Sequence, residues 1–140
     1  MSYLLDTNVV SEMFRAEPDK EVLAWFNNIP QGVLYVSVLT LGEIRKGIER
    51  QSAAHRREKL RVWLEYDMVE WIGNRILPIG AEVADRWGRL LAKVGRSVPT
   101  VDSLLAATAL HHELRMVTRN VRDFDFPDLE VVNPWVADAK

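Results

Sequence analysis

The stretch Tyr3-Leu4-Leu5-Asp6-Thr7-Asn8 places a short apolar run directly before an aspartate and two further polar residues. An apolar run of this length with a polar boundary is typical of a strand that is buried on both faces of a parallel sheet. Aspartate is also a favoured N-cap, so Asp6 predicts the start of a helix that runs to about Arg15. The stretch therefore predicts a strand that passes at Asp6 into a helix, as in an α/β fold.

Short aliphatic runs continue to alternate with longer helical patterns along the chain. Further strands are expected near residues 33–36, 75–79, 116–118 and 131–132. Two helices are expected to start at polar residues, one at Pro18-Asp19 and one at Ser37, and the second should reach about Gln51. Three further helices are expected to cover about 53–71, 81–94 and 100–113. This order predicts a three-layer α/β/α domain with a central, mainly parallel sheet of four to five strands. No linker or repeat divides residues 1–140, so a single domain is expected.

The composition narrows the possible chemistry. The chain is 48% hydrophobic and 27% charged, which excludes the disordered, collagen-like and membrane-spanning classes. It has no cysteine, so disulfides, thiolate zinc sites and a cysteine nucleophile are excluded, and any metal must be held by oxygen or imidazole. The formal charge of −2 is not the overall basicity typical of a nucleic-acid binder. The first residues lack the pattern of a signal peptide, so the cytoplasm is the expected location.

Three acidic residues occupy positions that suggest more than solubility. Asp6 follows a predicted strand, and ligands of α/β folds gather at the carboxyl ends of strands. Glu43 lies in a predicted helix beside Gly42 and Gly47, whose cost in a helix suggests that something approaches the backbone closely. Asp102 shares a helix face with small apolar residues, where an unpaired charge is costly. Each also has a simpler interpretation: an N-cap for Asp6, a solvated side chain for Glu43, and a first-turn acid for Asp102.

A polar cluster, Thr118-Arg119-Asn120 with Asp123, follows the fourth predicted strand. The first and fourth strands are neighbours in many doubly wound sheets. We therefore expect Asp6 to lie beside Thr118, Asn120 or Asp123.

Several carboxylates in one place repel one another unless a divalent cation offsets their charge. A site made only of oxygen ligands suits Mg²⁺ or Mn²⁺. Such an ion lowers the pKa of a bound water, and the resulting hydroxide can attack a phosphodiester.

The chain resembles the PIN-domain ribonucleases, in particular the VapC-type and FitB-like toxins of bacterial toxin–antitoxin pairs. The matching motifs follow the family's order and span nearly the whole chain; they are residues 4–8, residues 36–43 with Gly47, residues 99–107, residues 118–120 with 123–124, and residues 133–135.

The resemblance implies a metal-dependent endoribonuclease of a type II toxin–antitoxin system, with Mg²⁺ or Mn²⁺ as cofactor. Asp6, Glu43 and Asp102 fall on the family's three acidic positions, as catalytic residues and metal ligands. Asn120 stands where many members carry aspartate, and Asp123 is the nearest acid, so the second metal is expected to be weaker or to depend on Asp123. Supporting roles are expected for three further residues: Thr7, Asn8 and Thr118.

The implied partners are an RNA substrate, a cognate antitoxin of the VapB or FitA type, and a second copy of the chain in a homodimer, with higher assemblies formed together with the antitoxin. The alternative is a catalytically weak PIN domain that acts as an RNA- or antitoxin-binding module, which the neutral Asn120 keeps open.

Two positive patches are candidates for RNA contacts. The stretch from Arg45 to Arg61 carries a local charge of +5 and includes Lys46. Arg86, Arg89 and Lys93 form a stripe along one face of a predicted helix, which Arg96 continues. Solvated surface and phosphate contact are both open interpretations for each patch.

Overall fold

The computed structural model describes residues 1–136 and has a five-stranded parallel sheet at its centre. Its strands are β1 (Tyr3–Leu5), β2 (Leu34–Ser37), β3 (Ile76–Leu77), β4 (Arg115–Val117) and β5 (Val131–Val132). The sheet order is β3-β2-β1-β4-β5, and every neighbouring pair is parallel. The predicted strands are thereby confirmed within one or two residues at each end, and β1 and β4 are neighbours as expected.

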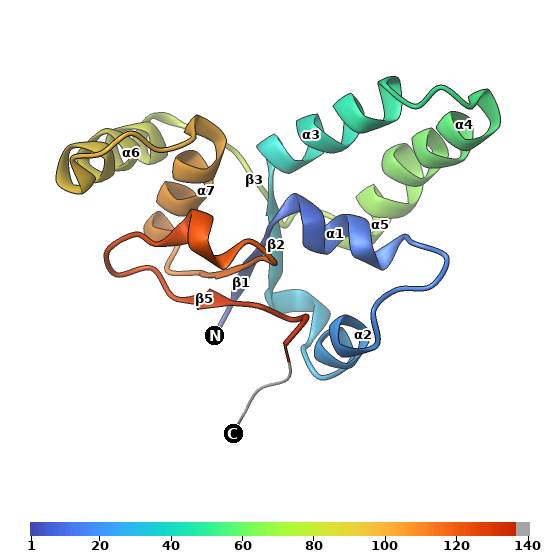
Figure 1. Ribbon diagram of the computed structural model, residues 1–140, viewed down its shortest axis with the longest axis horizontal. Coiled ribbons are helices and arrows are strands. Elements are labelled where there is room, and N and C mark those ends of the chain that lie inside the picture. The colour runs from blue at the N-terminus through green and yellow to red at the C-terminus, as the bar shows by residue number, and fades with distance from the viewer. Residues whose placement is uncertain (137–140) are drawn as a thin grey trace.

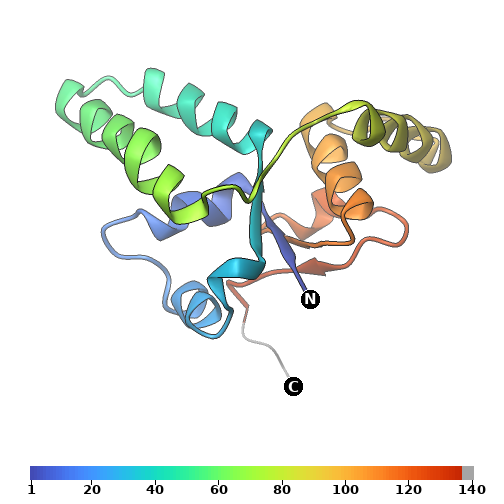
Figure 2. The same cartoon turned by 180° about the vertical axis from the view of Figure 1, so that it is seen from behind.

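Helices cover both faces of the sheet, which confirms the three-layer α/β/α architecture. One layer contains α1 (Thr7–Met13), α2 (Lys20–Asn27), α3 (Val38–Glu49), α4 (Ala54–Val62) and α5 (Val69–Ile72). The other contains α6 (Ala81–Val94) and α7 (Thr100–His111). Figure 1 shows the two layers on opposite sides of the strands, and Figure 2 shows the same division from behind.

Short helical turns complete the chain. Two of them are 3₁₀ turns, η1 (Gln31–Val33) and η3 (Val121–Phe124). The third, η2 (Trp63–Met68), is a π-helical turn. None of the helices in residues 1–136 combines the length and hydropathy needed to cross a membrane.

Alternate residues of the strands supply two separate cores. Leu5, Val36 and Val117 pack on the side of α1 and α3, whereas Leu4 and Met116 pack on the side of α6 and α7. All three residues of β1 are buried, since this strand lies in the middle of the sheet. The apolar run that opens the chain is therefore the shared wall of both cores.

The helix starts predicted at Asp6, Asp19 and Ser37 are confirmed by their capping bonds. The side chain of Asp6 accepts a hydrogen bond from the Thr7 amide, and the side chain of Asp19 accepts from Glu21 and Val22. Ser37 caps α3 through the Leu39 amide. Each cap satisfies an amide that the helix leaves without an internal partner.

The single helix predicted over 53–71 is wrong in detail. The α4 helix ends at Val62, the π-helical turn η2 follows, and α5 continues to Ile72. The wider turn buries Trp63, Leu64 and Met68. Apolar spacing reports which side chains are buried and does not distinguish an α-helix from a π-helical turn.

The predicted end of the last helix near Glu113 is also corrected, since α7 ends at His111. Glu113 adopts a left-handed conformation with φ 56°. Its amide donates to the Leu110 carbonyl, and the Leu114 amide donates to the Ala109 carbonyl. These bonds form a Schellman motif, which usually has glycine at the left-handed position. Glutamate at that position concealed the helix end in the sequence.

Replacing Glu113 by glycine should stabilise the protein by about 0.5–1 kcal/mol, because a side chain in the left-handed region is strained and glycine is not. Chemical denaturation measures this difference. Glu113→Val should have the opposite effect, since a β-branched residue is the worst fit at this φ. If the two variants unfold at the same denaturant concentration, the backbone at this position is not strained.

Candidate active site

The sequence-predicted acids gather at the carboxyl ends of the central strands. From β1 the chain continues to β2 and β3 on one side, and it then crosses to β4 and β5 on the other. Neighbouring strands whose connections leave in opposite directions open a crevice at their carboxyl ends. Asp6 and Thr118 directly follow the paired residues Leu5 and Val117, so they stand at this crevice.

Asp6 is held on both of its carboxylate oxygens. Its Oδ1 accepts from the Thr7 amide at 2.8 Å, and its Oδ2 accepts from the Thr118 hydroxyl at 2.7 Å. Asp6 is only 8% exposed and Thr118 is fully buried. The N-cap interpretation of Asp6 is therefore correct, and the same side chain also joins β1 to the end of β4.

Thr7 connects Asp6 to Glu43. Its amide donates to Asp6, and its hydroxyl donates to Oε1 of Glu43 at 2.5 Å. Glu43 lies in α3 and is exposed. A threonine at the first position of α1 thus orients carboxylates from two elements.

Asn8 and Thr118 form the second set of supporting contacts. The Asn8 amide group donates to the Thr118 hydroxyl at 3.5 Å, and its oxygen accepts from the Arg119 amide at 3.4 Å. The Thr118 hydroxyl also accepts from the Asn120 amide at 3.0 Å. The loop after β4 is therefore tied to the start of α1.

Asp102 comes from the opposite helix layer, in the first turn of α7. It is half-buried, and the apolar residues Leu105, Ala106 and Ala109 on the same helix face are fully buried. Asp123 lies in η3 and is exposed. Asn120 is also exposed, and no side-chain capping bond is formed from it to η3.

The carboxylates influence one another's protonation. Burial raises the pKa of Asp6 above its ordinary value, the bonds from Thr118 and Thr7 oppose this rise, and the charges of Glu43 and Asp123 add to it. Burial raises the pKa of Asp102 to about 6, with further contributions from the charges of Asp6, Asp123 and Glu43. The four acids thus form one electrostatic cluster, which we call the acidic cluster.

The donor atoms of the acidic cluster suit a hard divalent cation, but its side chains are not arranged as a complete set of metal ligands. All its donors are carboxylate oxygens, and their mutual repulsion is the kind that a cation relieves. Within residues 1–136, however, no three His, Asp or Glu side chains converge closely enough to hold an ion. Asp6 and Glu43 instead accept hydrogen bonds from Thr7 and Thr118. A bound ion therefore requires these side chains to rearrange.

Gly42 and Gly47 are not approached by other parts of this chain. Apart from chain neighbours and their own helix, no described atom lies within 4 Å of the position that a Cβ would take at either glycine. The close approach expected from the sequence is not made within residues 1–136.

The positive stripe on α6 lies away from the acidic cluster. Arg86 lines a depression together with Met1, Ser2 and Arg115, at the amino ends of the strands. Arg89 pairs with Asp85 at 3.1 Å, and Lys93 pairs with Asp128 at 3.7 Å. Their role in RNA binding stays a prediction.

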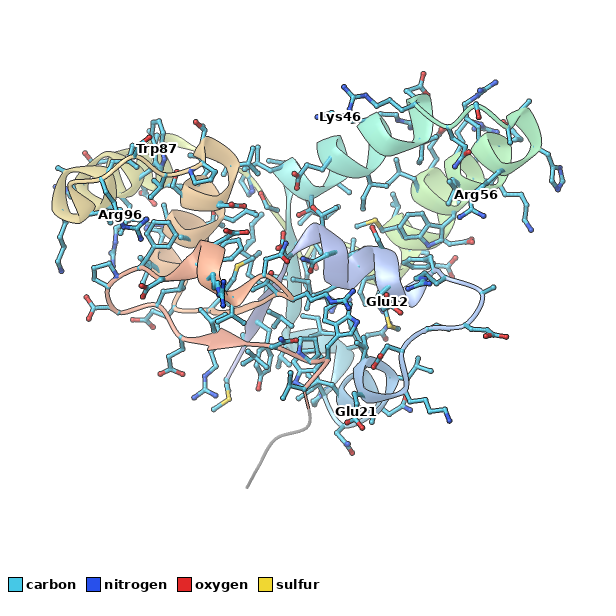
Figure 3. All side chains as sticks on the ribbon, in the orientation of Figure 1. Glu12, Glu21, Lys46, Arg56, Trp87 and Arg96 are labelled. Atoms are coloured by element: carbon cyan, nitrogen blue, oxygen red, sulfur yellow. The ribbon has the colours of Figure 1, made fainter. Side chains whose placement is uncertain are left out.

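The basic stretch from Arg45 to Arg61 is partly neutralised. Arg45 pairs with Glu65 at 3.1 Å, and Arg61 pairs with both Glu58 and Glu65. Lys46 is exposed on the outer side of α3 (Figure 3). RNA contact by Arg45 or Lys46 likewise stays a prediction.

A groove that the sequence did not reveal opens beside the acidic cluster, with a volume of about 510 Å³. Thr7, Asn8 and Glu43 line one end of it. Arg56 on α4 and Glu12 on α1 line it from the two helices that face each other in Figure 3. Its lining comes from elements that are far apart in the chain, so sequence spacing could not indicate it.

The fold and the acidic cluster define an α/β protein with carboxylates at the topological switch point of a parallel sheet. The PIN domain family model matches residues 3–130, and the chain belongs to the PIN-domain family.

Named relatives are similar over almost the whole chain. VapC ribonuclease Y4jK of Sinorhizobium fredii is 34% identical, covering 94% of this chain and 96% of that protein. Toxin FitB of Neisseria gonorrhoeae is also 34% identical, covering 94% of this chain and 97% of that protein. The solved structure of FitAcB from Neisseria gonorrhoeae has 32% identity and a TM-score of 0.87, covering 95% of this chain and 98% of that one.

Asp102→Asn should stabilise the metal-free protein at about pH 7.5 by a few degrees in thermal unfolding. The raised pKa means that the folded state binds the Asp102 proton more tightly than the unfolded chain. This contribution to stability is present below about pH 4 and is lost as the pH rises to about 6, where the carboxylate ionises against its neighbours.

The difference between wild type and Asp102→Asn should disappear at about pH 4. Asp67→Asn, on the exposed side of η2, is the matched control and should have no such pH dependence. A variant less stable than wild type at neutral pH would show instead that the Asp102 carboxylate makes a net stabilising contact.

Proposed function

We propose that this chain is a metal-dependent endoribonuclease toxin of a type II toxin–antitoxin system. The observation that carries the proposal is the acidic cluster, in which a buried strand-end aspartate couples to carboxylates from both helix layers. Similarity to proteins named a ribonuclease and a toxin supports it.

Asp6, Glu43 and Asp102 would hold Mg²⁺ or Mn²⁺, and Asp123 would complete the catalytic set. The ion, when bound, supplies a water of lowered pKa and offsets charge on the phosphate. The coupling of Asp123 to Asp6 and Asp102 supports a place for it beside the neutral Asn120.

The supporting residues orient these carboxylates. Thr118 holds the buried oxygen of Asp6, so the oxygen facing Thr7 is the one that can turn toward an ion. Thr7 holds Glu43 near Asp6, and it can release this bond when Glu43 binds elsewhere. Asn8 keeps the loop after β4 against α1. Hydrogen-bonded supports of this kind make carboxylate positions reproducible.

We also propose a cognate antitoxin of the VapB or FitA type as partner, and a homodimer as the assembly. The similarity to Toxin FitB and to the FitAcB structure supports the antitoxin. The homodimer rests on the family resemblance.

The alternative function is a weakly catalytic PIN domain that binds RNA or an antitoxin. Asn120 favours it, because an amide at the fourth position adds no charge for a second cation.

Cleavage of structured RNAs by the antitoxin-free protein should require Mg²⁺ or Mn²⁺ and stop in EDTA. Asp6→Asn, Glu43→Gln and Asp102→Asn should each lower the cleavage rate by about 10²-fold or more, because each removes a charged donor from the ion. Gel-resolved cleavage time courses measure this loss.

Glu49→Gln is the matched control for Glu43→Gln, since Glu49 is an exposed glutamate at the end of the same helix. It should cleave like wild type. If wild type never cleaves with either metal but still binds RNA or antitoxin, the binding-module function is correct.

The fourth acidic position is tested by moving its charge. Asp123→Asn should raise the Mn²⁺ concentration for half-maximal cleavage by about tenfold, and Asn120→Asp should lower it, because carboxylate charge sets the affinity for a hard cation. A metal titration of the cleavage rate measures both. Asp125→Asn, two residues beyond Asp123, is the control and should leave the titration unchanged. No shift with Asp123→Asn would remove Asp123 from the catalytic set.

A further inference from the structure

The groove adjoins the acidic cluster at Glu43. It runs between α1, α3, α4 and η2, and Glu43 lines both the groove and the cluster. A molecule lying in this groove therefore has one end next to Glu43.

Two of the three arginines that line the groove have no ion pair in the described part of the chain. The structure gives no ion pair within residues 1–136 to Arg56 or Arg119. Arg119 instead lies over the Trp135 ring, with its guanidinium carbon 5.1 Å from the ring centre. This cation–π contact holds the guanidinium in place and leaves its donors available. Arg15 also lines the groove and pairs with Glu12.

The acids of the groove do not cancel these charges. Glu12 is 5% exposed, and its oxygens accept from Arg15 and from the Asp19 amide. Glu43 stands at the cluster end, where Thr7 donates to it. Arg56 and Arg119 are therefore the charges available to an anionic ligand.

The remaining lining is aromatic and aliphatic. Phe14 is 38% exposed, and its ring centre lies 3.6 Å from that of Trp63. Trp63 is buried behind it, with the two ring planes tilted by 50°, so Phe14 packs against Trp63 and lines the groove with its exposed part. Gly47 also lines the groove and, having no side chain, leaves the backbone of α3 uncovered there. Free guanidinium groups next to a supported aromatic ring are the elements with which proteins bind single-stranded nucleic acid.

We propose that this groove binds the nucleotide next to the scissile phosphate of a single-stranded RNA, with Arg119 and Arg56 contacting its phosphates and Phe14 stacking on its base. This inference rests on the proposed ribonuclease function and adds the residues of a substrate subsite.

The groove suits RNA better than the stripe on α6 does. Two of the three stripe residues are already paired with Asp85 and Asp128, and Arg86 lies at the amino ends of the strands. Within residues 1–136, Arg56 and Arg119 have no ion pair, and they line a groove that adjoins the acidic cluster at Glu43. An apolar peptide is the competing occupant, but it would leave both guanidinium groups unpaired.

The binding test uses a short fluorescein-labelled single-stranded RNA in EDTA, followed by fluorescence anisotropy at several salt concentrations. Arg119→Ala and Arg56→Ala should each weaken binding about tenfold and lower the slope of log affinity against log salt by about 0.7, because each removes one phosphate contact. Phe14→Leu should weaken binding by about tenfold with an unchanged salt slope, because it removes stacking and no charge. A duplex RNA should show none of these differences.

Lys20→Ala is the matched control, since it removes an exposed positive charge at the start of α2, outside the groove and outside both positive patches. Arg119→Lys should restore part of the salt slope, and Trp135→Leu should weaken RNA binding with the arginine retained, because the guanidinium loses its support. Thermal unfolding of each variant identifies any loss that is due to misfolding. With metal present, the groove variants should raise KM and leave kcat nearly unchanged.

The outcomes separate this inference from the proposed function. Wild-type cleavage together with unchanged RNA affinity in all the groove variants would overturn the subsite and leave the ribonuclease intact. Loss of RNA binding with Arg86, Arg89 and Lys93 charge reversals alone would assign the substrate to the stripe on α6. Loss of antitoxin binding with unchanged RNA binding would make the groove a peptide site. Wild type that neither binds nor cuts RNA would overturn the proposed function itself.

Discussion

The hydrogen bond from the Thr118 hydroxyl to Oδ2 of Asp6 is the contact on which the rest of the site depends. It joins the ends of two neighbouring strands, and it satisfies a carboxylate that the sheet has almost removed from solvent. Because the other oxygen of Asp6 caps α1, the same side chain determines where that helix begins. Thr7 then positions Glu43 through the hydrogen bond from its hydroxyl to Oε1 of Glu43. The position of the cluster is thus set by backbone elements rather than by long, mobile side chains.

This arrangement has an electrostatic cost. Burial and neighbouring charges both raise the pKa of Asp102, and burial raises that of Asp6, so the folded protein opposes the charged state that cation binding uses. A cation would relieve this repulsion. Glu43 accepts from the Thr7 hydroxyl, and no three acids within residues 1–136 converge closely enough to hold an ion. Unfavourable electrostatics concentrated at one site beside buried apolar cores are typical of functional regions in proteins.

The sequence predicted the strands, the helix caps and the neighbourhood of Asp6 and Thr118, because these follow from local patterns and from the common sheet order. It did not predict the π-helical turn η2, since burial of Trp63 and Met68 is compatible with either helix type. It placed the end of α7 too late, because Glu113 adopts a conformation that glycine usually signals. The groove was also missed. Arg56, Arg119 and Phe14 belong to different parts of the chain, and only the three-dimensional fold brings them to one groove.

The order of the strands explains why a cleft with these properties arises at β1 and β4. One half of the fold consists of β2 and β3 with α1 to α5. The chain then crosses β1 to form the other half, which consists of β4 and β5 with α6 and α7. Asp6 lies where the halves meet, Glu43 comes from the first and Asp102 from the second. A change in the packing of either layer therefore alters the spacing of the carboxylates. A ligand that spans Glu43 and Asp102 would hold the two halves together, so ion binding and the stability of the fold are physically linked.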